Sequence, residues 1–241
     1  LHSWNFIDQN LPHASLLGRE GLVTDGAELA ISLPTPHPSR LALSYGSPPE
    51  HRHGHGHGHG QEHHDEEGHE ENGHGEADSE ELLELTGDLF TANLSAELAH
   101  NDFHLWRATA SFATAADNHG NHPELYGIGL AYNWREKGYS PGGRALLLRA
   151  EAFFRTGTDT LGATSSAIFQ ANHHLDLALR ADFLEDPGHL RLSPAVTFRP
   201  VIASDSNPTS AHLRLQYNYD RPSHARDEHT LLLQLGLGWG S

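Results

Sequence analysis

The chain has 241 residues and a formal net charge of −17 at pH 7, and it contains neither cysteine nor methionine. The lack of cysteine excludes disulfides and thiolate metal sites, and the acidic balance argues against a nucleic-acid partner, which requires a basic surface. No apolar run approaches the roughly 18 to 20 residues that a membrane-spanning helix needs. The sequence begins LHSWNF, without an initiator methionine or apolar signal region, so we expect a processed or truncated piece of a longer product.

The first predicted elements are two strands, at residues 29–33 and 41–45, in which apolar and more polar residues alternate. Alternation with period two predicts strands, because successive side chains of a strand point to opposite faces. The proline-rich turn from Pro34 to Pro38 joins them. We therefore predict an antiparallel hairpin here.

Residues 51–81 carry nine histidines, ten carboxylates and one arginine, and they account for about half of the net charge. Neutral imidazole is the commonest protein ligand for zinc, and carboxylates add oxygen ligands and a field that attracts cations. Alternating glycine keeps the segment flexible, and ordering it costs about 1 to 2 kcal/mol per residue, so we expect several weak, interchangeable sites for zinc or another divalent cation. The alternative is a solvated loop without function. The candidate ligands are His51, His53, His55, His57, His59, His63, His64, His69, His74, Glu66, Glu67 and Glu70.

Nine further segments that alternate in the same way follow, and they bring the count to about eleven predicted strands. The last segment is the clearest, because Leu231, Leu233 and Leu235 share one face while Thr230 and Gln234 share the other. The nine segments lie near residues 90–98, 103–112, 126–134, 146–154, 165–171, 175–183, 190–198, 213–219 and 231–239.

The fold class that these strands predict is all-β, an antiparallel transmembrane β-barrel. A soluble β-sandwich also alternates, but strands of about 10 to 12 residues are roughly twice the usual soluble length. Aromatic residues stand near strand ends, as Trp134, Tyr219 and Trp239 do, where a membrane interface favours them. We expect residues 28–241 to form the barrel and residues 1–27 to lie on the outer side or in the lumen.

The position of the histidine-rich segment follows from counting connections backward. If the last strand ends in the periplasm, the connection near Arg221 to Glu228 is extracellular, and every second connection shares that side. The count places the loop at residues 47–84 outside the cell. An odd number of strands leaves an open edge, which lipid does not tolerate, so we expect further strands upstream.

Several segments together resemble a family of proteobacterial outer-membrane proteins, often described as zinc-regulated or as TonB-dependent receptors, with a porin-like barrel. In that family the stretch matching His2, Trp4, Phe6 and Asp8 lies well inside the protein, so the resemblance implies a whole barrel of about 16 strands. This chain shows no plug domain or energy-coupling box, so coupling to the TonB system gains no support here. The matching segments are HSWNFIDQNLPHASLLGREGL, DGAELAISLPTP, ELYGIGLAYNW, LSPAVTFRP, HLRLQYNYD and EHTLLLQLGLGW.

The leading functional hypothesis is capture or passage of divalent metal ions, zinc foremost, across the bacterial outer membrane, with a lipid bilayer as the other partner. Alternatives are a general diffusion porin whose acidic loop has no specific cargo, and a soluble or surface metal-buffering β protein. An enzyme is not expected, because neither a Gly-x-Ser-x-Gly nor a His-Glu-x-x-His motif is present. Charges on the polar faces either line a pore or brace its wall. These pore-lining candidates are Glu97, Arg149, Glu151, Asp176, Arg180, Asp182, Arg191 and Arg214.

Overall fold

The computed structural model describes residues 6–17, 25–47, 88–116, 120–138, 140, 143–201 and 209–239. Within them the chain forms one short helix and eleven strands. The helix is α1 (Leu11–Leu17). The strands are β1 (Asp25–Leu33), β2 (Ser39–Ser47), β3 (Leu89–Asn101), β4 (His104–Thr114), β5 (Glu124–Arg135), β6 (Ala145–Arg155), β7 (Thr160–Asn172), β8 (Leu175–Leu184), β9 (His189–Val201), β10 (Thr209–Pro222) and β11 (Glu228–Trp239).

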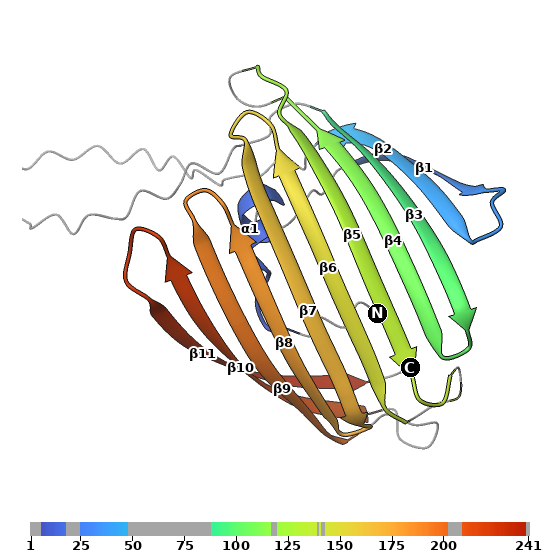
Figure 1. Ribbon diagram of the computed structural model, residues 1–241, viewed down its shortest axis with the longest axis vertical. Coiled ribbons are helices and arrows are strands. Elements are labelled where there is room, and N and C mark those ends of the chain that lie inside the picture. Colours follow the sequence, from blue (N-terminus) through green and yellow to red (C-terminus); the bar gives the residue numbers. More distant parts are fainter. Residues whose placement is uncertain are drawn as a thin grey trace, which may run out of the picture.

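The eleven strands form a single antiparallel sheet in which each strand pairs with its neighbours in the chain, in the order β1 to β11. The prediction of an all-β fold with about eleven antiparallel strands is confirmed. β1 and β11 are the two edges of this sheet, so the described strands do not close on one another. Figure 1 shows the resulting open, strongly twisted array.

The connections gather at two ends of the sheet. At the proximal end, where β1 passes into β2, lie the turns 34–38, 102–103 and 173–174, the end of β5 at Arg135 with the start of β6 at Ala145, and the end of β9 at Val201 with the start of β10 at Thr209. Two of these turns are two residues long and use the same device: the Asn101 side chain accepts from the Phe103 amide, and the Asn172 side chain accepts from the His174 amide. Asparagine stabilises such turns because its side-chain oxygen mimics a backbone acceptor. At the opposite, distal end, β2 ends at Ser47 and β3 begins at Leu89.

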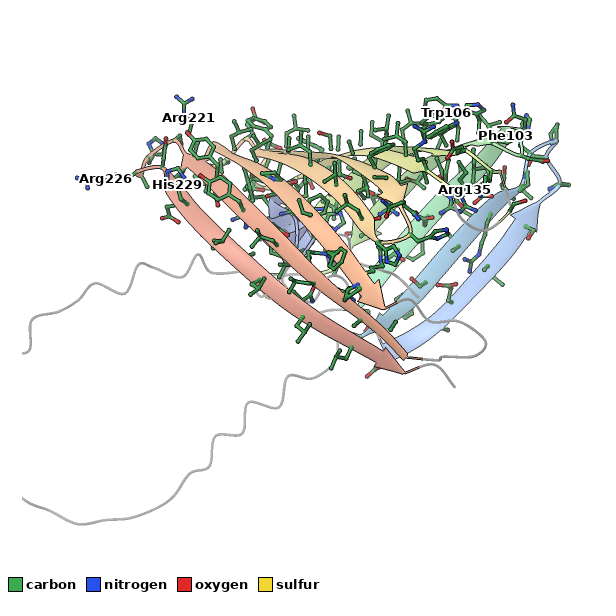
Figure 2. The ribbon with its side chains drawn as sticks, turned by 90° about the horizontal axis from the view of Figure 1, so that it is seen from below. Phe103, Trp106, Arg135, Arg221, Arg226 and His229 are labelled. Atoms are coloured by element: carbon green, nitrogen blue, oxygen red, sulfur yellow. The ribbon has the colours of Figure 1, made fainter. Side chains whose placement is uncertain are left out.

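The sheet curves into a trough with two unlike faces (Figure 2). On the convex side, called the outer face below, apolar side chains project away from the molecule, and the labelled Trp106 stands there. The concave side, called the inner face, carries the intervening polar residues. Leu213, Leu215 and Tyr217 of β10 are exposed, whereas the alternating Arg214 and Gln216 are buried. The alternation in the sequence therefore corresponds to an apolar outer face and a polar inner face of the sheet.

Residues 6–17, called the N-terminal segment below, lie against the inner face. α1 contacts β7 and β8 from the concave side of the sheet (Figures 1 and 2). The Asn10 side chain accepts a hydrogen bond from the amide of His13 at 2.8 Å, which caps the first turn of the helix. Within the described residues, no helix is sufficiently long and apolar to cross a membrane.

Candidate functional site: the two faces of the sheet

The outer face exposes large apolar side chains on every strand. On β11 the exposed fractions of Leu231, Leu233 and Leu235 are 68%, 69% and 69%, and Ile128 of the central β5 reaches 68%. A water-soluble sheet buries such a face against a second layer, because each buried leucine contributes about 1.5 to 3 kcal/mol. Among the described residues, the only helix packs on the other face.

Aromatic side chains on the outer face collect in two bands, one near each end of the strands. Within each band, rings of neighbouring strands are in contact. The ring centroids of Phe112 and Tyr126 lie 5.3 Å apart at the distal end, and those of Trp106 and Tyr132 lie 4.5 Å apart at the proximal end. The distal band comprises Tyr45, Phe90, Phe112, Tyr126, Phe154, Phe183, Tyr217 and Tyr219. The proximal band comprises Phe103, Trp106, Tyr132, Trp134, Phe169 and Phe198. Aliphatic residues such as Leu94 and Leu179 fill the zone between the bands.

The inner face holds a buried cluster around Asp8 of the N-terminal segment. The Asp8 carboxylate accepts hydrogen bonds from Arg180 of β8 at 2.8 Å, Arg191 of β9 at 3.2 Å, Asn218 of β10 at 2.8 Å, and Gln216 of β10. Burial raises the pKa of Asp8, but the two guanidinium groups and the Gln216 amide outweigh it, and the net pKa lies below its usual value. Asp8 is therefore ionised at neutral pH.

The cluster also binds the backbone and ring of the N-terminal segment. Arg180 Nη1 donates to the Asp8 carbonyl at 3.0 Å, and the amide of Ile7 donates to Gln216 Oε1 at 2.7 Å. The Arg180 guanidinium carbon lies 4.7 Å from the centre of the Phe6 ring, within the range of a cation–π contact. Three consecutive residues of the segment are thus recognised by two side chains of the sheet.

A second set of contacts seats α1. The Leu11 amide donates to Asp182 Oδ2 at 3.3 Å, and Thr164 of β7 donates to Asp182 Oδ1 at 2.6 Å. Arg180 Nε lies 3.0 Å from Asp182 as an ion pair without hydrogen-bond geometry. Gly162 of β7 lies directly beneath the helix, where a Cβ atom would come within 2.8 Å of the Pro12 side chain. This close approach is the reason that glycine fits there.

Further polar contacts brace the inner face between β8 and β11. Arg199 pairs with Asp176 at 2.9 Å, and Arg214 donates to Thr197 at 2.9 Å. Arg191 donates to Asp220 at 2.6 Å, in addition to its contact with Asp8. The buried polar side chains of the described residues all belong to β7, β8, β9 and β10.

The inner face of β1 to β6 is more open. Glu97 of β3 pairs with Arg107 of β4, and both side chains remain substantially exposed. A cavity of about 390 Å³ lies over β4, β5 and β6, lined in part by Asn133, Arg149 and Glu151. Glu151 also forms an ion pair with α1, in which its Oε2 atom lies 3.3 Å from His13 Nε2. This part of the inner face is accessible to a small solute.

The predicted site residues fall into two groups. The eight pore-lining candidates all lie on the inner face: Glu97 on β3, Arg149 and Glu151 on β6, Asp176, Arg180 and Asp182 on β8, Arg191 on β9, and Arg214 on β10. Four of these candidates, Asp176, Arg180, Asp182 and Arg214, are buried. The twelve candidate metal ligands between residues 51 and 81 lie outside the described residues. Within the described part of the chain, no group of three or more metal-ligating side chains is positioned to hold an ion.

Sequence reasoning did not single out the residues that hold the N-terminal segment in place. In the sequence, Gln216 and Asn218 are recognisable only as members of a polar strand face. No local sequence pattern links them to Asp8, which is 208 and 210 residues away. One available signal was the row Arg214, Gln216, Asn218 and Asp220, an unbroken run of polar residues on one face of β10. Such a row on a concave face requires hydrogen-bonding partners.

Comparisons of the chain with family models, curated proteins and solved structures found no match.

Proposed function

We propose that this chain is a porin-like protein of the bacterial outer membrane, in which the sheet is the wall of a transmembrane barrel. The observation that carries the proposal is the reversed burial of the two faces. Among the described residues nothing packs on the apolar outer face, where Leu233 and Leu235 are each 69% exposed, while the polar inner face is covered in part by residues 6–17. A lipid-facing wall with a wet interior has this arrangement, and a soluble sandwich has the opposite one.

Strand length and aromatic position support the same proposal. The strands contain 9 to 14 residues, and a tilted strand needs about 9 to 11 to cross the hydrocarbon core. The two aromatic bands with an aliphatic zone between them match the girdles that mark the two interfaces of a bilayer. In lipid the unpaired edges of β1 and β11 must be satisfied, so closure requires that these edges pair with each other or with further strands.

For the cargo, we propose divalent cations, zinc foremost, captured at the extracellular side. The support is the composition of residues 51–81, whose imidazoles and carboxylates suit such ions. They fall in the sequence between Ser47, the end of β2, and Leu89, the start of β3, and both of these strand ends lie at the same end of the sheet as the turns 156–159, 185–188 and 223–227. Imidazoles and carboxylates gathered near a pore mouth raise the local concentration of cations there.

General diffusion of small hydrophilic solutes is the second candidate, and the inner face favours it. Its side chains carry both signs of charge in close alternation, as in the Glu97–Arg107 and Asp176–Arg199 pairs. A wall of paired charges leaves little net field to select cations over anions. The two candidates share the barrel and differ in the role of residues 51–81.

Flux measurements on the full chain in lipid vesicles separate the candidates. Zinc entry at low external zinc is compared between the wild type and a variant in which the nine histidines of residues 51–81 are serines, which keeps the length and the carboxylates. Metal capture predicts a several-fold slower zinc entry in the variant, with unchanged permeation of a neutral sugar. Equal zinc entry would assign the protein to general diffusion, and vesicles that remain sealed to every solute would contradict the pore itself.

A further inference from the structure

We propose that the N-terminal segment is a built-in plug, seated on the inner wall by a carboxylate-binding site that Asp8 fills, and that unseating it widens the passage. The site consists of Arg180, Arg191, Gln216 and Asn218. This inference rests on the proposed pore and adds to it a moving part and the chemistry of its latch.

The site is built in advance of its ligand. Neighbouring carboxylates hold the two guanidinium groups in place: Asp182 lies 3.0 Å from Arg180 Nε, and Asp220 accepts from Arg191 Nε at 2.6 Å. Gln216 is completely buried and also donates to Asn218 at 2.8 Å. Each group therefore keeps its orientation through contacts that do not involve Asp8, as a preorganised binding site requires.

The donors match an ionised carboxylate. Two guanidinium and two amide groups converge on the two Asp8 oxygens from β8, β9 and β10. Hydrogen bonds from a cation to a carboxylate are roughly twice as strong as neutral ones, which makes the site selective for an anion of this shape. A carboxylate side chain is the ligand it holds, and a small free carboxylate is the solute that can replace it.

The N-terminal segment is not part of the hydrogen-bonded sheet. Residues 6–17 pair with no strand, and they contact the wall through side chains, through the Ile7 and Leu11 amides, and through the packing of Pro12 over Gly162. They cover β7 to β10 on the inner side and leave the cavity over β4 to β6 uncovered. In the seated state the passage runs on the β4–β6 side, and release of the segment would add the β7–β10 side.

The direct test compares the unitary conductance of the full chain with that of the Asp8→Ala variant in planar bilayers. Asp159→Ala, in the exposed turn between β6 and β7, serves as the matched control for loss of one carboxylate. The plug predicts a larger conductance for Asp8→Ala and none of this increase for the control. Equal conductance in all three proteins would overturn it.

A second readout does not depend on conduction. The chain has no cysteine, so Ala14→Cys places a single thiol on α1. Adding Asp8→Ala to this variant is expected to speed maleimide labelling by about tenfold or more, the factor that corresponds to losing one charge-assisted hydrogen bond. Millimolar acetate, which can fill the vacated site, is expected to restore part of the protection, whereas chloride at the same ionic strength is not. An unchanged labelling rate would overturn the seat, and equal effects of acetate and chloride would overturn its selectivity for carboxylates.

The two readouts also separate this inference from the proposed pore. Channels of equal size in wild type and variant, with labelling that ignores Asp8, would refute the plug and leave the pore intact. A labelling rate that depends on Asp8 in a protein that never conducts would refute the pore and with it the widening, while the carboxylate site would stand.

Discussion

The inner face has two halves that the same alternating pattern produces and that differ in what covers them. On β7 to β10 the N-terminal segment covers the sheet, and polar side chains such as Arg180 and Asp182 are 4% and 1% exposed. On β1 to β5 the ion pairs face open space, as Glu97 with Arg107 does. The difference teaches that the period of a strand assigns a residue to a face, while the energetic importance of that residue depends on its contacts outside the sheet.

The largest expected effect is the loss of Asp182 from the covered half. Its side chain is completely buried, accepts hydrogen bonds from the Thr164 hydroxyl and the Leu11 amide, and forms an ion pair with Arg180. Removing one partner of a buried pair leaves an uncompensated charge, so Asp182→Ala should lower the free energy of unfolding by about 3 to 5 kcal/mol. Denaturant titration in lipid vesicles measures this change. A loss as small as that expected for an exposed ion pair would contradict the burial of Asp182 beneath the N-terminal segment.

A somewhat smaller effect is expected from filling the space under α1. In Gly162→Val, the added side chain would meet Pro12 and Leu16, and overpacking of this kind costs about 1 to 3 kcal/mol. This cost weakens the packing of α1 on β7, so maleimide labelling of the cysteine in the Ala14→Cys variant should become faster. Gly157→Ala is the control for loss of a glycine, because a Cβ there meets no atom, although its φ of +88° makes it a strained position of its own. A labelling rate of Ala14→Cys that Gly162→Val leaves unchanged would contradict the packing of α1 on β7.

The acid response of the covered half depends on Asp8. The pKa of seated Asp8 lies below its usual value, so the stability that ionised Asp8 contributes is fully present above the usual carboxylate range and is lost as pH falls through the depressed pKa. Conductance should therefore stay constant from neutral pH down to the usual carboxylate range and rise only in stronger acid. Arg180 and Asp182 on β8, Arg191 on β9 and Asp220 on β10 face the same cluster.

The Asp8→Asn variant separates Asp8 from these neighbours. It keeps the shape of the side chain and removes its titration, so the acid-induced rise should disappear. A rise that persists in Asp8→Asn would assign the response to Asp182 or Asp220 instead.

The smallest expected effect belongs to the open half. Glu97→Gln should change the free energy of unfolding by less than about 1 kcal/mol, because its partner Arg107 is 54% exposed and water screens the pair. The small difference should shrink further at high salt. A loss comparable to that of Asp182→Ala would remove the distinction between the two halves.

Much of the sheet could be predicted from the sequence, because its determinant is local. Alternation such as Leu231, Leu233 and Leu235 against Thr230 and Gln234 identifies both a strand and its two faces. The turn at Pro34 to Pro38 likewise identified the first hairpin. The number of strands and their antiparallel order followed from these signals.

The seat of the N-terminal segment could not be predicted, because its contacts join residues far apart in the chain. Asp8 meets Arg180 and Asn218 across 172 and 210 residues, and α1 is a seven-residue helix without an apolar period to reveal it. The charges at Arg180, Asp182 and Arg191 were predicted to share one face, but their alternation does not say that a carboxylate from elsewhere would join them. Residues 51–81, the most conspicuous part of the sequence, lie outside the described structure, and their metal binding stays a prediction.

The central claim, that the outer face contacts lipid, is tested most directly by scanning single spin-labelled cysteines along β3 from Asn93 to Leu98 in bilayers. The account predicts a period of two: labels at Leu94, Ala96 and Leu98 relax in response to lipid-soluble oxygen, and labels at Asn93, Ser95 and Glu97 respond to a water-soluble nickel chelate. Outer-face labels that respond to the nickel chelate as strongly as the inner ones would contradict it.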